Sequence, residues 1–84
     1  MTRHELVVPE LGLGDRPLNL SLWLVKAGSE VNEGDRVVEV VSDGVSIDLP
    51  APASGRLVRT LVLEDAPIKV GQSLGLIDSM AEET

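Results

Sequence analysis

Cysteine, phenylalanine and tyrosine are absent from the 84-residue chain, and Trp23 is its only large aromatic residue. The absence of cysteine excludes disulfides and thiolate metal sites, and the length allows one small domain. The hydrophobic core must therefore be aliphatic. With 12 valines, 13 leucines and 3 isoleucines, the chain lies well above the roughly 20% of branched aliphatic and Phe residues below which chains stay disordered. We expect it to fold.

Basic residues are scarce as well, with 7 Lys and Arg against 14 Asp and Glu, a formal net charge of −7. This charge repels phosphate backbones and anionic lipid surfaces, so nucleic acid and membranes are poor partners. No apolar run approaches the roughly 20 residues of a transmembrane helix. Residues 2–5 do not begin a signal peptide, and the expected location is the cytoplasm.

The apolar stretches are short, rich in valine and leucine, and end at Gly, Pro or Asp, which predicts an all-β fold. The clearest strand is 18–25, where leucines at every second position predict one inward leucine face with Trp23 on the other side. Trp23 could contact a partner, but a role in the core is favoured. Further strands are predicted at 5–8, 36–42, 45–49, 56–63 and about 72–78. The domain then covers 1–78, and 79–84 form an acidic tail or linker stub.

Asp43-Gly44 lies between two of these strands and favours a type I′ hairpin turn. Both central residues of that turn have positive φ, which Asp and Gly tolerate best. A tight, exposed hairpin tip is therefore predicted at this position.

The chain also contains an internal repeat. A shift of 37 residues superimposes 31–37 on 68–74, aligning Gly34 with Gly71, and it also brings Leu20 onto Leu57. Two such units, each too small to bury its own apolar face, can pack about a pseudo-two-fold axis into a flattened barrel of two antiparallel sheets. The same shift moves the hairpin tip onto residues 80–81, so we expect the tip and the termini at opposite ends.

Several segments together resemble the biotinyl/lipoyl attachment domains, most closely the lipoyl domains of 2-oxo acid dehydrogenase acyltransferases. The resemblance covers about 5–78 and rests on VPELG at 8–12, LWLVKAG at 22–28, EGD at 33–35 and VSIDLPAP at 45–52. It implies a flattened β-barrel, or barrel-sandwich hybrid, of two four-stranded antiparallel sheets with internal two-fold symmetry.

The resemblance fails at one decisive place. In lipoyl domains the hairpin tip carries Asp-Lys followed by Ala or Val, and the lysine amine receives lipoate as an amide. Here the corresponding residues are Ser42, Asp43, Gly44 and Val45, with Gly44 in the place of the lysine. Val41 also replaces the usual glutamate of the preceding strand. The resemblance therefore implies a vestigial attachment hairpin and no lipoate cofactor.

Three hypotheses of function remain. The first is a non-catalytic scaffold or protein-recognition module, associated with a 2-oxo acid dehydrogenase component or with another protein. The second is a lipoyl carrier domain of an acyltransferase, modified at an atypical lysine, Lys69 or Lys26, or with its lysine exchanged for Gly44. The third is the barrel part of a periplasmic adaptor, against which the missing signal peptide argues.

Other candidate sites are weaker. Glu39, Asp43 and Asp48 could form a cation site, but strand alternation favours ordinary solvated carboxylates. His4 lies in an N-terminal segment expected to be mobile, with no second histidine or cysteine to complete a metal site. Seven serines beside one histidine offer no catalytic triad. We expect no catalytic residues, no metal and no enzymatic activity in this chain.

Overall fold

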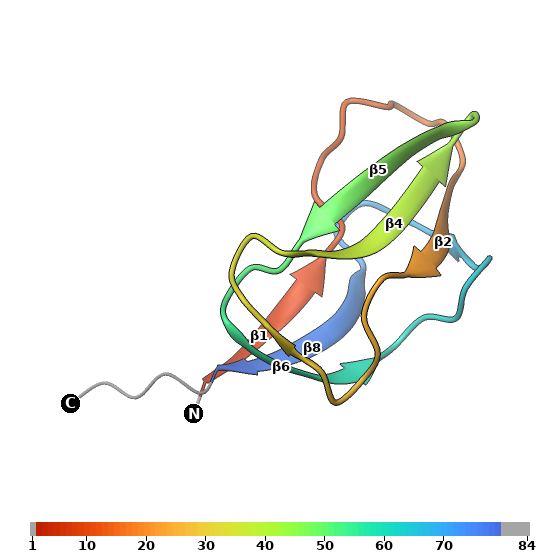
Figure 1. Cartoon of the computed structure of the whole chain (residues 1–84). Helices are drawn as coiled ribbons and strands as arrows, with labels where there is room; N and C mark the ends of the chain where they lie inside the picture. Colours follow the sequence, from red (N-terminus) through yellow and green to blue (C-terminus); the bar gives the residue numbers. More distant parts are fainter. Residues whose placement is uncertain (1, 80–84) are drawn as a thin grey trace.

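The computed structural model describes residues 2–79, which form two four-stranded antiparallel sheets without a helix (Figure 1). The first sheet has the order β1-β8-β6-β3 and the second β5-β4-β2-β7. The strands are β1 (Thr2–Val7), β2 (Leu18–Trp23), β3 (Glu30–Val31), β4 (Arg36–Ser42), β5 (Val45–Pro50), β6 (Gly55–Thr60), β7 (Pro67–Ile68) and β8 (Ser73–Ser79). The predicted all-β fold of two sheets is thereby confirmed. Its two-residue strands, β3 and β7, were not among the predicted strands.

The two halves of the chain, β1–β4 and β5–β8, repeat the same hydrogen bonds, as the 37-residue shift predicts. Leu24 N donates to Val37 O at 2.9 Å, and Leu61 N donates to Leu74 O at 2.8 Å. The irregularity in the β2–β4 ladder between Leu20 and Leu22 likewise recurs 37 residues later in the β6–β8 ladder. The pseudo-two-fold symmetry therefore extends from the sequence to individual backbone atoms.

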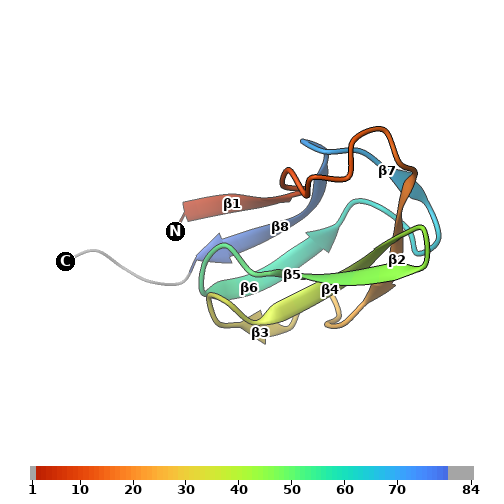
Figure 2. The same cartoon turned by 90° about the horizontal axis from the view of Figure 1, so that it is seen from above.

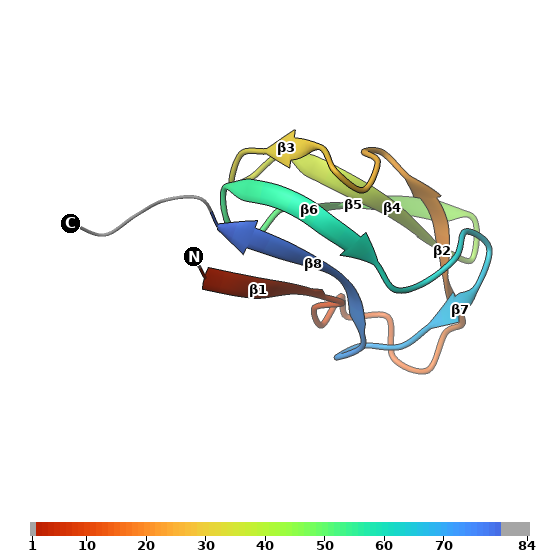
Figure 3. The same ribbon diagram turned by 90° about the horizontal axis from the view of Figure 1, so that it is seen from below.

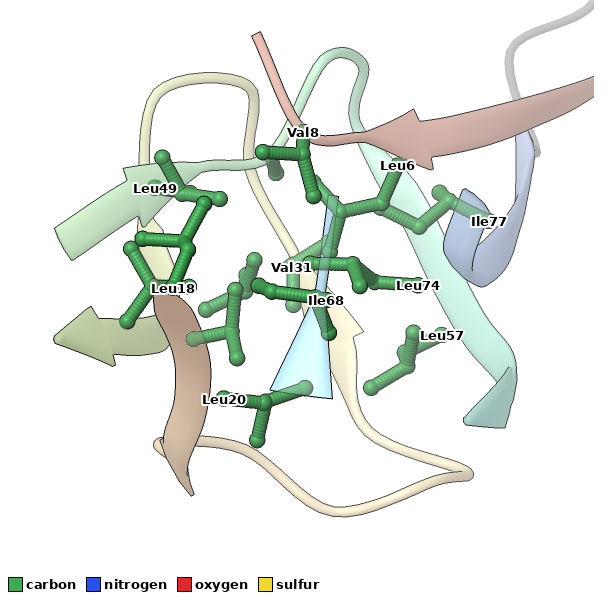
Figure 4. Packing of buried hydrophobic residues seen from close by; sticks show 14 residues of the cluster. Leu6, Val8, Leu18, Leu20, Val31, Leu49, Leu57, Ile68, Leu74 and Ile77 are labelled. Atoms are coloured by element: carbon green, nitrogen blue, oxygen red, sulfur yellow. The ribbon is translucent and has the colours of Figure 1, made fainter. Parts of the chain in front are cut away.

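The core lies between the two sheets, which Figures 2 and 3 show as stacked layers. Side chains from both sheets meet there, and all the fully buried ones are aliphatic (Figure 4). Leu20 of β2 and Leu57 of β6, which the repeat aligns, are both 0% exposed. Burial of one such side chain contributes about 1.5–3 kcal/mol, so an aliphatic core can hold this small domain without disulfides.

Strand β2 departs from its predicted alternation. Leu18 and Leu20 point inward, but the irregularity after Leu20 reverses the facing of the side chains that follow. Leu22 and Leu24 are 45% and 40% exposed, whereas Trp23 packs against the core. The prediction of a continuous inward leucine face is therefore wrong beyond Leu20.

Trp23 has a structural role, the interpretation that the sequence favoured. Its indole Nε1–H donates to the carbonyl oxygen of Val62 at 3.0 Å, in the connection between β6 and β7. Its ring lies so close to Gly75 that a Cβ built there would be 3.2 Å from the ring edge. Trp23 thus reaches from β2 of the second sheet to Gly75 in β8 of the first.

The chain ends differ from the sequence prediction at both boundaries. The first strand begins at Thr2, so His4 is paired with Ile77 inside β1 and does not lie in a mobile segment. Ser79, predicted to begin the tail, is the last residue of β8. The remainder of the predicted tail, 80–84, lies outside the described residues.

Candidate functional site

The hairpin tip is the turn between β4 and β5, and it lies at the end of the barrel away from Thr2 and Ser79, the first and last described residues (Figure 1). Ser42 and Val45 are paired in the ladder, and Asp43 and Gly44 connect them with φ of 50° and 79°. Positive φ at both central residues is the signature of the predicted type I′ turn. The hairpin and its position are therefore as expected.

The four tip residues differ sharply in exposure. Ser42 is 3% exposed, and its Oγ has no hydrogen-bond partner among the described residues. Asp43, Gly44 and Val45 are exposed, and a Cβ built on Gly44 would meet no atom within 4 Å. The turn therefore projects from the barrel, and position 44 has open space around it for a side chain that glycine does not supply.

An ion pair joins the tip to the long loop between β1 and β2. Arg16 Nε lies 3.5 Å from Asp43 Oδ2, and both side chains are about three-fifths exposed. Exposed pairs of this kind contribute 1 kcal/mol or less. The contact places the β1–β2 loop beside the tip without holding it there strongly.

The two lysines lie at different ends of the barrel. Lys26 follows the end of β2, whereas the tip lies level with the start of that strand, where Asn19 pairs with Val41. Lys69 follows β7 and lines a pocket together with Arg16. Lys69 therefore lies at the same end of the barrel as Arg16, the ion-pair partner of Asp43.

The repeat also explains the local structure at Lys69. Its backbone N–H donates to Gln72 Oε1 at 3.0 Å, just as Asn32 N–H donates to Asp35 Oδ2 at 2.8 Å in the first half. This confirms the predicted equivalence of Lys69 with Asn32. Lys69 thus occupies a turn that both halves share, in which its backbone N–H forms the repeated hydrogen bond.

The three candidate carboxylates do not form one site. Glu39 and Asp48 face each other across the β4–β5 ladder, and Arg36 Nη1 lies 3.6 Å from Asp48 Oδ2. Asp43 lies apart from them at the tip, paired with Arg16. Within residues 2–79, no group of three or more His, Cys, Asp or Glu side chains is arranged to hold a metal ion.

Comparison with known proteins identifies the fold and its family. The family described as "Biotin-requiring enzyme", the biotin/lipoyl domains, matches residues 4–77. The chain belongs to this family. Residues 2–79 contain no helix that is long and apolar enough to cross a membrane.

Curated relatives with similar sequences are acyltransferases. The chain is 35% identical over 82 residues to the dihydrolipoyllysine-residue acetyltransferase component of the acetoin cleaving system of Pseudomonas putida, covering 96% of this chain and 22% of the relative. It is 30% identical over 79 residues to the corresponding component of the pyruvate dehydrogenase complex of Bacillus subtilis, covering 94% and 18%. This biotin/lipoyl domain therefore spans only about a fifth of the length of these relatives.

Two solved structures share the fold. The lipoyl domain of the 2-oxoglutarate dehydrogenase complex from Azotobacter vinelandii aligns with a TM-score of 0.64 at 23% identity, covering 86% of this chain and 89% of that domain. A single-chain, multi-domain long-chain acyl-CoA carboxylase aligns with a TM-score of 0.75 at 18% identity, covering 95% of this chain and 7% of that one. At these identities the likeness supports the fold alone.

Proposed function

We propose that this biotin/lipoyl domain is a non-catalytic scaffold or protein-recognition module that does not carry lipoate at its hairpin. The observation that supports the proposal most directly is the tip itself. The hairpin, its I′ geometry and its exposure are intact, while Gly44 offers no amine for an amide bond. A fold kept in full beside a tip without a nucleophile is expected of a domain that binds other proteins through its surface.

The partner proposed for this module is a component of a 2-oxo acid dehydrogenase complex. Support comes from the acyltransferase relatives, whose names place them in the pyruvate dehydrogenase complex and the acetoin cleaving system. The chain's net charge of −7 favours a partner with a basic surface and disfavours nucleic acid. Binding can be measured by sedimentation of the chain with each purified component of such a complex.

Modification by a lipoyl ligase tests the carrier question. The native chain, Gly44→Lys and the double variant Val41→Glu/Gly44→Lys are incubated with ligase, lipoate and ATP, and intact masses are measured. We expect no lipoyl adduct on the native chain and an adduct on at least the double variant. A Lys69→Arg variant identifies the modified residue if the native chain does gain mass, an outcome that would favour an atypical carrier domain.

Restoring the amine should not unfold the domain. Position 44 has open space, so the cost of Gly44→Lys comes from the left-handed backbone and is about 1 kcal/mol. An unfolded variant would be recognised by urea denaturation before the ligase assay. The control is an ordinary lipoyl domain treated with the same ligase. If that domain is modified and the folded double variant is not, the proposal that this hairpin derives from a lipoyl attachment site loses its support.

A further inference from the structure

A pocket of about 390 Å³ opens between the β1–β2 loop and the residues around β7, at the same end of the barrel as the hairpin tip. Figures 2 and 3 both show this loop passing beside β7. Five aliphatic side chains contribute to the lining: Leu11, Leu13, Leu18, Ile68 and Val70. The volume falls within the range of small-molecule sites, about 300–1,000 Å³. We call it the loop pocket.

The loop pocket exists because the two halves of the chain differ in one loop. The β1–β2 connection, 8–17, has ten residues, whereas its counterpart between β5 and β6, 51–54, has four. Several of the lining residues, among them Leu13 and Arg16, come from the longer connection. The second half has no equivalent of this wall, so the pocket is an addition to the repeated barrel.

The charged groups of the lining are not equally available to a ligand. The Lys69 ammonium forms no ion pair or side-chain hydrogen bond with any described residue. Arg16 contacts only one oxygen of Asp43, through Nε, which leaves its terminal nitrogens as donors. Glu10 Oε2, by contrast, accepts the Gly12 backbone N–H at 3.0 Å. Asp15 is the one lining carboxylate without a partner within residues 2–79.

We propose that the loop pocket binds a monocarboxylate with a flexible aliphatic tail, such as a medium-chain fatty acid. The aliphatic lining receives the tail, and the carboxylate pairs with the Lys69 ammonium, with the free Arg16 nitrogens as second donors. Glu10 and Asp15 balance the charge of the two cations, so the preference for a carboxylate rests on the Lys69 ammonium, the one lining cation without a partner within residues 2–79. Binding at this site needs no covalent attachment. The proposal is therefore tested independently of the proposed loss of lipoylation.

Octanoate, kept below its micellar concentration, is the probe. Titration of the ¹⁵N-labelled chain should shift backbone amides of residues 10–16 and 68–70 in a saturable way. Lys69→Gln should weaken binding about fivefold, because it removes one partly exposed ion pair. Asp15→Asn should strengthen it about twofold by removing the opposing charge. Lys26→Gln, the matched lysine variant at the other end of β2, should leave the affinity unchanged.

Octylamine separates charge recognition from apolar contact alone. The proposal requires octanoate to bind more tightly than octylamine, and the preference to decrease in Lys69→Gln. Equal binding of both compounds, an unchanged octanoate affinity in Lys69→Gln, or no saturable shifts in the native chain would each overturn it. The unbound spectra show whether every variant is folded, so a folding defect is not mistaken for loss of the site.

Discussion

The two halves of this chain build the same strands and turns, yet they differ at a few positions that determine what the domain can do. Hydrogen bonds recur 37 residues apart: Gly28 N donates to Leu57 O, and Asp65 N donates to Leu20 O, both at 2.6 Å. The differences are the long β1–β2 loop, the side chain of Trp23 and a few turn residues. The repeated hydrogen bonds hold the barrel together. Of the features that do not repeat, the β1–β2 loop shapes the surface, and Trp23 adds packing against the core.

Trp23 gives the largest expected difference in stability between equivalent positions of the two halves. Its counterpart in the second half is Thr60, which is exposed. Trp23→Thr makes the first half resemble the second and removes both the ring packed on the core and the Nε1–H bond to Val62 O. We expect a loss of about 3 kcal/mol in the free energy of unfolding, measured by urea denaturation.

Thr60→Ala is the matched control, and it should change stability by less than about 0.5 kcal/mol. If the two substitutions had similar effects, the half-specific role of Trp23 would be wrong. The fluorescence of Trp23 reports unfolding of the native chain and of Thr60→Ala. Unfolding of Trp23→Thr, which has no tryptophan, is followed by circular dichroism.

The two halves also differ in the residue that occupies an equivalent left-handed turn position. Gly28 has φ of 97°, and its counterpart Asp65 has φ of 71°. Glycine adopts this conformation without strain, while other residues pay about 1–2 kcal/mol. Gly28→Asp should therefore destabilise the chain by about 1 kcal/mol. Asp65→Gly should have a smaller effect, because relief of strain is offset by the greater freedom of glycine in the unfolded chain.

Both variants are compared with the native chain by urea denaturation. A Gly28→Asp protein as stable as the native chain would show that the two turns tolerate a side chain equally.

An ion pair found in only one half gives the smallest effect. Arg3 Nε lies 2.8 Å from Asp78 Oδ1, whereas the counterpart of Asp78 in the first half is Val41. The hydrogen bond and charge of the Arg3 guanidinium lower the pKa of Asp78 below its ordinary value. A carboxyl with a lowered pKa stabilises the fold above its unfolded pKa of about 3.9, and this contribution is lost as the pH falls through the folded pKa.

Asp78→Asn should therefore be less stable than the native chain at pH 6, with the gap closing below about pH 4. Unfolding is measured in urea at several pH values. A gap of the same size at both ends of this range would mean that Asp78 acts through packing and not through its charge.

The sequence predicted the strands and the hairpin from local patterns, and the pair of sheets from the match between segments 37 residues apart and from the family resemblance. Alternation and turn chemistry are properties of short segments. The facing of Leu22 and Leu24 could not be predicted in this way. One irregularity after Leu20 reverses the alternation, and no residue type in 18–25 marks where such a bulge falls.

The candidate site was only partly predictable for a related reason. Asp43-Gly44 specifies its own turn, so the tip was evident from two residues. The loop pocket depends on how a ten-residue connection folds over the end of the barrel, where Arg16 pairs with Asp43 and Leu13 lines the same pocket as Val70. Contacts between segments so distant along the chain leave no periodic signal. The β3 and β7 strands escaped prediction because two residues are too few for alternation to show.

The pairing of Thr2 with Ser79 across β1 and β8 has a consequence for engineering. Antiparallel partners lie about 5 Å apart at their Cα atoms, so the two ends of the described barrel leave it side by side. The domain could be inserted into a surface loop of an unrelated host protein without separating the two ends of that loop. The Asp43-Gly44 apex would then face away from the graft, which makes the barrel a handle for displaying short peptides.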